Sequence, residues 1–299
     1  MSKSVLVELS DALADAAETA GKATVLVNAR RRMPASGIAY AADLILTADH
    51  VIEREEDIKV SLADGTEVSA KVAGRDAGSD VAVLKLERAA ATVAEVTKGP
   101  ARLGQIALVL GRPSKNGIEA SLGTVSAIGG PIRTGRGGML ERYIRTDGIS
   151  YPGFSGGPLV AADGTVLGLN TSGLASGAAV TIPADIAWKV AETLAKHGRI
   201  KRGYLGIRSQ TVEIPNASRG ALTREQDAGL LIVSVEKDSP ASKGGLIVGD
   251  ILIAVAGSPV LHHDELFAHL NGEVVGKSTS VEILRGGQPQ TINVLIGER

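Results

Sequence analysis

The chain has 299 residues, of which 44% are hydrophobic and 2% aromatic, and it carries a formal net charge of −1. A chain of this length suggests about two domains, and its near-neutral charge gives no electrostatic reason to expect nucleic acid or an anionic membrane as a partner. Because the sequence contains no cysteine, it can form neither a disulfide framework nor a thiolate metal site.

Residues 1–21 predict a short amino-terminal helical segment. Apolar residues between Val5 and Ala16 recur at helical spacing, and charged residues interrupt them, so no apolar stretch of signal-peptide length is present. No segment approaches the roughly 18 consecutive apolar residues of a membrane-spanning helix. We therefore expect no membrane span and a cytoplasmic location for the chain as written, or a periplasmic or extracytoplasmic one if it is a trimmed form of a secreted protein.

Residues 22–200 predict a mainly β domain. Short apolar runs alternate with Gly, Asp and Pro turns, and Asp-Gly pairs at 64–65 and 163–164 are strong hairpin signals. A basic run at 30–32 is interpreted as a solvated loop, and a helix is expected over 184–197. The clearest strands are expected at 23–28, 44–47, 58–62, 67–72, 81–86, 106–110, 123–128, 159–160 and 165–170. This pattern favours two β-barrels with a substrate cleft between them.

Residues 203–299 predict a second, smaller unit that mixes helix and strand. A helix is expected over 263–270, and two strands at 279–285 and 290–296 are joined through a Gly-Gly pair. Three histidines lie near this helix without carboxylates in a recognisable metal-binding pattern. We interpret them as solvated helix residues and expect no metal or other cofactor; they are His262, His263 and His269.

The run Gly153-Phe154-Ser155-Gly156-Gly157 predicts a serine exposed at a tight turn. Glycine lets the backbone bend there and leaves backbone N–H groups free to point at a substrate oxygen. We therefore expect Ser155 to be a nucleophile and the N–H groups of Gly153 and Ser155 to form an oxyanion hole.

Two upstream residues complete a catalytic triad. His50 follows one apolar run and Asp80 precedes another, so the order His, Asp, Ser is that of chymotrypsin. A serine hydroxyl needs a base to take its proton, histidine titrates near neutral pH, and a carboxylate fixes the imidazole tautomer. Asp49 is a rival carboxylate, but neighbouring side chains on an extended backbone point apart, which favours Asp80.

Taken together, these motifs resemble those of the HtrA family of serine proteases, from about residue 20 onward. The runs TADHV, SDVAVLKL, SGGPL, GLNT and GYLGI occur in the order of that family. The resemblance implies a two-barrel, chymotrypsin-like protease domain over residues 22–200 and a PDZ domain over residues 203–299. It also implies an ATP-independent endopeptidase that cleaves misfolded or damaged proteins, often as a homotrimer.

The same resemblance implies that the PDZ domain binds carboxyl-terminal peptides by adding them to a sheet edge. The loop and strand for this task are Tyr204, Leu205, Gly206 and Ile207, and the groove residues expected from the helix are Leu266, His269 and Leu270. An alternative stays open, in which Leu205 and Ile207 are core residues and Gly206 is only a turn.

The specificity pocket is expected to be apolar. Ile149, six residues before the serine, is the expected floor, and residues 164–184, which include Leu169, Asn170 and Thr171, are the expected walls and contain no charged side chain. Burying an unpaired Lys or Arg there is costly, so we predict cleavage after small or medium aliphatic residues. The same residues also fit ordinary buried strands.

Phe154 departs from the family, where the residue before the nucleophile is commonly Asn. We expect it to shade the cleft or to alter the oxyanion loop. It supports an alternative function, a protease-like chaperone or peptide-binding scaffold with weak or regulated catalysis. In a further alternative, a peptide-binding adaptor without hydrolytic activity, the triad is coincidental.

Overall fold

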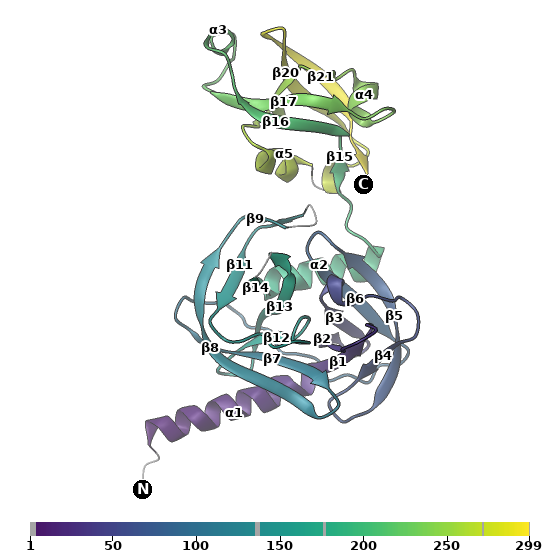
Figure 1. Cartoon of the computed structure of the whole chain (residues 1–299), viewed down its shortest axis with the longest axis vertical. Helices are drawn as coiled ribbons and strands as arrows, with labels where there is room; N and C mark the ends of the chain where they lie inside the picture. Colours follow the sequence, from purple (N-terminus) through teal and green to yellow (C-terminus); the bar gives the residue numbers. More distant parts are fainter. Residues whose placement is uncertain (1–3, 135–137, 176–177, 271, 299) are drawn as a thin grey trace. The chain divides into compact units, whose positions relative to one another are not determined.

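The computed structural model describes residues 4–134, 138–175, 178–270 and 272–298. The chain divides into two compact units, Met1–Ile200 and Lys201–Arg299, and each is described by itself. The first unit holds two closed β-barrels, and the second holds a sheet with short helices (Figure 1). The expected mainly β fold is confirmed.

The first barrel has the strand order β1-β2-β3-β6-β5-β4, with every neighbouring pair antiparallel. Its interior contains only aliphatic side chains, in agreement with the scarcity of aromatic residues. The turn between β4 and β5 is the expected hairpin, with Gly65 at a φ of +84° that glycine adopts without strain. The strands are β1 (Thr24–Asn28), β2 (Ala35–Ala41), β3 (Leu44–Thr47), β4 (Ile58–Ser61), β5 (Glu67–Asp76) and β6 (Val81–Leu86).

The second barrel has the order β11-β14-β13-β12-β7-β8. The second Asp-Gly pair forms the expected hairpin between β12 and β13, where Gly164 has a φ of +84°. A two-stranded sheet, β9 (Ile132–Arg133) with β10 (Met139–Leu140), lies between β8 and β11 in the chain. The barrel strands are β7 (Ile106–Ser114), β8 (Gly117–Gly129), β11 (Tyr143–Thr146), β12 (Pro158–Ala161), β13 (Val166–Ala175) and β14 (Ala178–Pro183).

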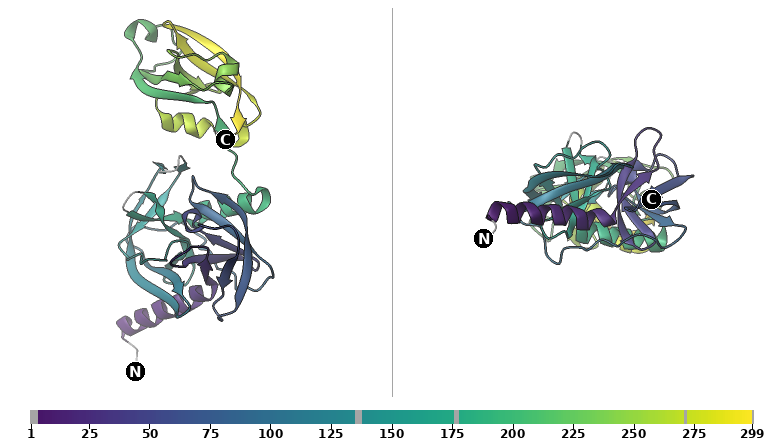
Figure 2. Two further views of the ribbon diagram at one scale, coloured as in Figure 1. Left: turned by 45° about the vertical axis from the view of Figure 1, so that its right-hand side comes forward. Right: turned by 90° about the horizontal axis from the view of Figure 1, so that it is seen from below.

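Two helices pack on these barrels. α1 (Val5–Ala23) lies against β7 and β12 through Ala16 and Ala20, while its first turns extend past the barrel (Figures 1 and 2). α2 (Ala184–His197) buries an Ala-rich stripe and Leu194 against apolar residues of both barrels, and it ends at Gly198 in the left-handed conformation that favours a helix stop. Among helices of the described ranges, none is both long and apolar enough to cross a bilayer.

The second unit is a sheet of order β16-β17-β18-β20-β21, to which β19 adds by pairing with β18. A separate pair, β15 with β22, joins the two ends of the unit. Its strands are β15 (Gly203–Tyr204), β16 (Ile207–Glu213), β17 (Ala228–Val235), β18 (Ile251–Val255), β19 (Ser258–Pro259), β20 (Ser278–Arg285), β21 (Gln288–Leu295) and β22 (Gly297–Glu298). Its helices are α3 (Asn216–Arg219), α4 (Pro240–Gly244), α5 (His263–His269) and the 3₁₀ turn η2 (Gly272–Val274).

Candidate active site

A 3₁₀ turn at the end of β3, η1 (Asp49–Val51), presents His50. Its ring nitrogen Nδ1 lies 2.8 Å from Oδ2 of Asp80 and 3.1 Å from Oδ1, and its backbone N–H donates to Oδ1 at 2.8 Å. A carboxylate only accepts hydrogen bonds, so the proton of the neutral imidazole lies on Nδ1. This leaves Nε2 unprotonated, as a general base requires.

Asp80, directly before β6, has no exposed surface. Besides His50, it accepts a hydrogen bond from the hydroxyl of Thr171 on β13, so donors from both barrels meet at one carboxylate. Its φ is +55°, a conformation that Asp tolerates better than most residues. Such strained residues are concentrated at functional sites.

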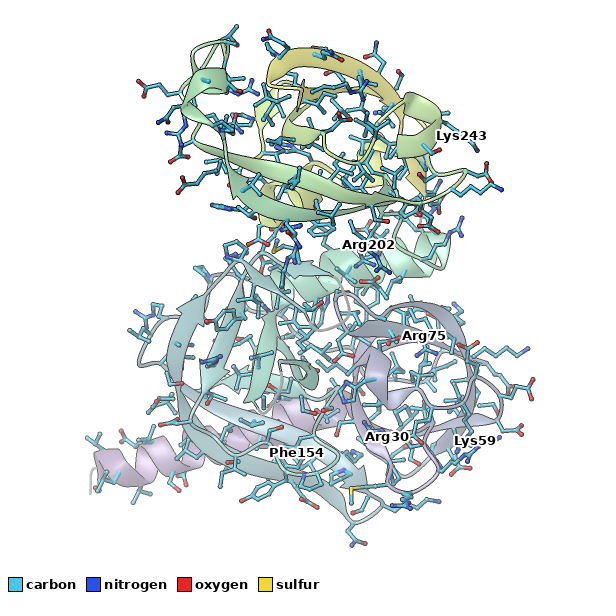
Figure 3. The ribbon with its side chains drawn as sticks, turned by 45° about the horizontal axis from the view of Figure 1, so that its top comes forward. Arg30, Lys59, Arg75, Phe154, Arg202 and Lys243 are labelled. Atoms are coloured by element: carbon cyan, nitrogen blue, oxygen red, sulfur yellow. The ribbon has the colours of Figure 1, made fainter. Side chains whose placement is uncertain are left out.

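Asp49 does not compete for the imidazole. Its Oδ1 accepts from Nε of Arg75 at 2.6 Å, and a second nitrogen of Arg75 pairs with Glu55 at 2.8 Å. The hydrogen bond that Arg75 donates to Asp49 raises the pKa of Arg75, and the bond to Glu55 adds to this effect. The structure therefore pairs His50 with Asp80. Figure 3 labels Arg75, the partner of Asp49.

Arg30 is not the solvated loop residue that the sequence predicted. It is half-buried, and its Nε is fully buried without a hydrogen-bond partner among the described residues. Burial lowers the pKa of its guanidinium, while the negative charges of Glu53 and Asp80 oppose that shift. A positive charge therefore lies within electrostatic range of the candidate catalytic carboxylate. Figure 3 labels Arg30.

The loop before Ser155 forms a tight turn. Phe154 N–H donates to the carbonyl of Tyr151 at 3.0 Å, and Gly153, with φ +88°, takes the position of a type II turn that requires glycine. Across the described part of the chain, the N–H groups of Gly153 and Ser155 have no acceptor. Two unpaired amides beside a serine hydroxyl are what an oxyanion hole requires.

Ser36 on β2 holds this loop in place. Its hydroxyl donates to the carbonyl of Gly153 at 2.7 Å, and its N–H donates to the carbonyl of Ser155 at 3.1 Å. Arg112 N–H donates in turn to the Ser36 hydroxyl at 2.8 Å. A Cβ at Gly156 would lie 2.1 Å from the carbonyl oxygen of Ser36, so this close approach requires glycine. Sequence analysis did not identify Ser36.

Phe154 does not shade the cleft. Its side chain has no exposed surface and packs in the core of the second barrel, edge-on to Tyr151 at 5.4 Å between ring centroids (Figure 3). Gly111 makes room for it, because a Cβ there would lie 2.5 Å from the ring. The expectation of an obstructed cleft is wrong, since the ring points away from the nucleophile into apolar surroundings.

Ser155 has 7% of its surface exposed, and its Oγ lies 3.1 Å from Oγ of Ser172. Among the described residues, no hydrogen bond joins Ser155 to His50. The segment 172–173 contacts both residues, because Gly173 packs against the imidazole: a Cβ there would lie 2.5 Å from Nδ1. Ser172 and Thr171 are contacts of the triad that sequence analysis did not assign.

The expected pocket residues lie elsewhere. Leu169 is fully buried in the core, Asn170 accepts from Thr181 through its side chain, and Thr171 donates to the triad carboxylate, so none is a free wall. Ile149 is 57% exposed and does not form an enclosed floor. Successive strand residues point to opposite faces, and because the three consecutive side chains at 169–171 are all buried, both faces of β13 are covered here. Residues 176 and 177 of the expected wall lie outside the described residues.

In the second unit, the N–H groups of Leu205 and Gly206 have no acceptor among the described residues. Gly206 has a φ of +79°, and the Tyr204 hydroxyl donates to Glu236. Strand β16 pairs with β17 on one side only, so its other edge is free within the described strands. Unpaired amides beside a free sheet edge suit the capture of a terminal carboxylate.

Several residues expected in the peptide groove are instead core residues. Leu205, Leu266 and Leu270 are buried in one apolar cluster, against which Ile207 packs, while His269 is half-buried. Although the Leu205 side chain is buried, the backbone N–H groups of Leu205 and Gly206 have no acceptors among the described residues. His263 is not solvated as expected, because its Nε2 lies 3.0 Å from both the carbonyl and the hydroxyl oxygen of Ser209.

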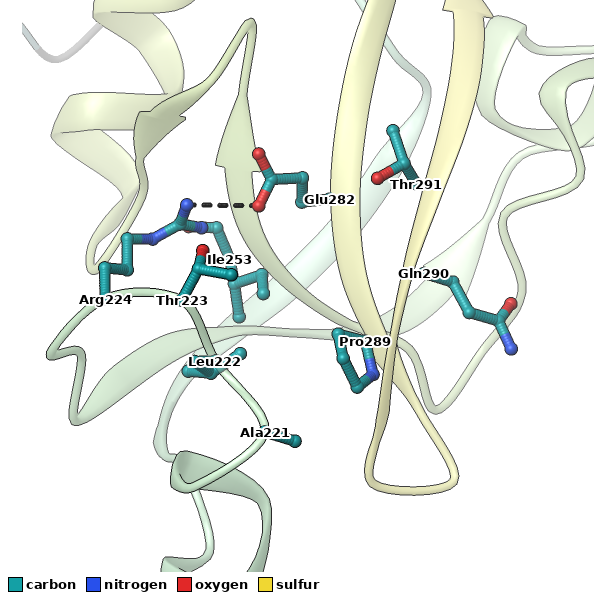
Figure 4. Close-up of a pocket in the computed structure, with 9 residues that line it drawn as sticks. All are labelled: Ala221, Leu222, Thr223, Arg224, Ile253, Glu282, Pro289, Gln290 and Thr291. Carbon is teal, nitrogen blue, oxygen red and sulfur yellow. Dashed lines mark hydrogen bonds and ion pairs between the residues drawn. The ribbon is translucent and has the colours of Figure 1, made fainter.

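A pocket of about 210 Å³ opens in the second unit between residues 221–224 and strands β20 and β21 (Figure 4). Arg224 pairs with Glu282 across it at 3.0 Å. It shares no lining residue with the loop at 204–207 or with α5, and we assign it no ligand. Within the described residues, no group of three or more His, Asp or Glu side chains is placed to hold a metal ion.

Two adjoining barrels, a half-buried His50 paired with the buried Asp80, and a serine turn with amides that lack acceptors among the described residues define a chymotrypsin-like serine peptidase domain. Residues 35–169 match the family model of the trypsin-like peptidase domain, and residues 203–296 match that of the PDZ domain. The chain is 36% identical over 270 residues to a protein of Pseudomonas fluorescens described as a probable periplasmic DegP-like serine endoprotease. That match covers 88% of this chain and 56% of the relative, so the chain spans about half the length of such relatives.

Solved structures extend the similarity over nearly the whole chain. The serine endoprotease from Yersinia pestis superposes with a TM-score of 0.78 at 30% identity, covering 96% of this chain and 98% of that one. The HtrA-type protease AlgW with a decapeptide gives 0.79 at 26% identity, with the same coverage. The chain belongs to the HtrA family of proteases.

The assignment of Asp80 can be tested against Asp49. We expect Asp80→Asn to lower kcat by about 10⁴, because an amide no longer fixes the imidazole tautomer. Asp49→Asn should retain activity within a few fold, since this side chain pairs with Arg75 instead. Peptidase rates of both variants, normalised to folded protein by circular dichroism, measure this. An equal loss in the two variants would contradict the assignment.

Proposed function

We propose that this protein is a serine endopeptidase that cleaves unfolded or damaged proteins and binds peptides through its PDZ domain. The observation that carries the proposal is the contact of His50 with the buried Asp80, next to a serine turn with two free amides. Membership of the HtrA family supports it, as does the peptide in the AlgW structures. No cofactor is needed for this chemistry.

The proposed reaction proceeds through an acyl-enzyme. Oγ of Ser155 attacks the peptide carbonyl while its proton moves to Nε2 of His50, and Asp80 stabilises the resulting imidazolium. The tetrahedral oxyanion accepts hydrogen bonds from the N–H groups of Gly153 and Ser155. The imidazolium then protonates the leaving amine. A water molecule, deprotonated by the same histidine, hydrolyses the ester and restores the serine.

The first test removes the nucleophile. Ser155→Ala should abolish cleavage of casein, and His50→Ala should lose about as much activity, because triad members act as a unit. Thermal unfolding of both variants should match that of the unmodified protein to within a few degrees. Undiminished proteolysis by purified Ser155→Ala would overturn the proposal.

The second test concerns specificity. Residues 164–184 contain no charged side chain, so whichever of them borders the cleft beside Ser172 offers a substrate Lys or Arg no partner, and burying that charge unpaired is costly. We therefore predict that cleavage sites in casein, mapped by mass spectrometry, cluster after Val, Ala, Ile or Leu. A map dominated by Lys and Arg would show that the pocket is charged.

The third test concerns peptide capture. The free N–H groups of Leu205 and Gly206 and the free edge of β16 suit a peptide with a terminal carboxylate. With the full-length Ser155→Ala protein, we expect micromolar binding of a peptide with an apolar carboxyl terminus, roughly −8 kcal/mol at a Kd of 1 μM. Amidating that terminus should weaken binding at least tenfold in calorimetry. Equal affinities for both peptides would rule out carboxylate capture.

A periplasmic location is the one we infer. The DegP-like relatives of Pseudomonas and Halomonas are described as periplasmic, and the cytoplasmic location expected from the sequence finds no support in them. The homotrimer expected from the family resemblance stays a prediction. The exposed apolar side chains of Val5, Leu6 and Leu9 on α1 offer a surface for such an assembly.

A further function has a specific observation in its favour. In the described part of the chain, Ser155 is hydrogen-bonded to Ser172 and has no bond to His50, which fits the alternative of a peptide-binding protease whose catalysis is regulated. The intact His50–Asp80 pair argues against permanent inactivity. The adaptor without hydrolytic activity has no comparable support.

A further inference from the structure

The hydrogen bond between Ser155 and Ser172 connects the nucleophile to an exposed side chain. Ser155 Oγ is almost buried and lies 3.1 Å from Oγ of Ser172, which is exposed on β13. The base has its own fixed contact, since Nδ1 of His50 lies 2.8 Å from the carboxylate of Asp80. The imidazole is thus aligned for catalysis while the serine hydroxyl is directed elsewhere.

The position of Ser172 follows from its neighbours. Successive residues of a strand point to opposite faces, so the buried Thr171 reaches Asp80 while Ser172 points toward the nucleophile. Gly173 N–H donates back to the Thr171 hydroxyl at 2.9 Å and fixes the backbone on the other side. Thr171 and Gly173, which contact Asp80 and the imidazole, flank Ser172 and therefore also fix the position of its hydroxyl.

This bond opposes nucleophilic attack whichever hydroxyl donates. If Ser155 donates, its proton is directed to Ser172 and not to Nε2 of His50, the acceptor that general-base catalysis requires. If Ser155 accepts, its own proton is free, but the position of Oγ against Ser172 makes no hydrogen bond to His50 among the described residues, so Oγ must still move to reach its base. The hydroxyl of Ser155 must leave Ser172 before its proton can pass to His50.

We propose that Ser172 is a positioning residue that holds Ser155 away from His50 until a substrate displaces it. A substrate carbonyl must approach Ser155 Oγ, next to Ser172, and a peptide backbone offers Ser172 alternative donors and acceptors. Binding of the peptide then releases the nucleophile to its base. This inference rests on the proposed peptidase function and adds to it a resting state controlled by one hydroxyl.

Removing the hydroxyl should activate the free enzyme. We expect Ser172→Ala to raise the second-order rate constant for a small fluorophosphonate by about threefold to tenfold, as the loss of one neutral hydrogen bond predicts. With a peptide substrate, the gain should appear as a lower KM with little change in kcat, because the bond is already broken in the complex. The pH midpoint of the reaction should stay the same, since the His50–Asp80 pair is unaltered.

Matched variants separate this role from a structural one. Ser172→Gly removes the same hydroxyl and should also activate, Ser172→Thr keeps a hydroxyl and should stay near the unmodified rate, and Ser126→Ala removes another exposed serine as the control. An unchanged or lower rate in both Ser172→Ala and Ser172→Gly would overturn the inference. If the unmodified protein itself does not react at Ser155, the proposed function fails instead, and the two failures are thus distinguishable.

Discussion

The buried carboxylate of Asp80 is the constraint on which the first unit depends. A charge without exposed surface is tolerated only when hydrogen-bond donors surround it. Here the donors are the backbone and ring of His50 from the first barrel and the hydroxyl of Thr171 from the second. Satisfying one charge therefore requires both barrels to be correctly placed, and the same contacts orient the base. Structural and catalytic demands coincide at this carboxylate.

A second set of contacts joins the barrels at the nucleophile. Ser36 binds the main chain on both sides of Phe154, and Thr47 Oγ1 donates to the Ser36 carbonyl at 2.7 Å. With these bonds in place, the amides of Gly153 and Ser155 have no acceptor in the described ranges, although most buried amides in proteins find one. The turn thus holds two N–H donors that can stabilise the oxyanion, which in the proposed reaction exists only transiently.

The sequence predicted those features that depend on local patterns. The helix Ala184–His197 begins and ends where the apolar spacing and Gly198 placed it, and both Asp-Gly hairpins form. The strands β2 and β14 were missed; both contain Ala residues, and β2 has Ile38 as its one β-branched residue. These strands are buried because the barrels close, and closure depends on residues that are far apart in the sequence.

The same distinction applies to the site. His50, Asp80 and Ser155 could be proposed as a triad because their order and flanking runs follow a known catalytic scheme, and the structure brings His50 and Asp80 into contact. The roles of Ser36, Thr171 and Ser172 depend on residues 11 to 117 positions away in the chain. The residues next to such a serine or threonine in the sequence do not indicate which group its hydroxyl contacts in the fold. The prediction of the pocket walls met a related difficulty, since spacing in the sequence does not tell which side chains of β13 are covered in the fold.

Phe154 gives the nucleophile loop an anchor of unusual physical character. The loop is fixed on one side by hydrogen bonds and on the other by a ring that fills space in an apolar core. Apolar burial responds little to ionic strength or protonation, but it weakens on cooling. The shape of the oxyanion loop should thus tolerate acid and salt, while low temperature loosens its attachment. The conformation of this loop should therefore depend more on temperature than on the pH or ionic strength of the medium.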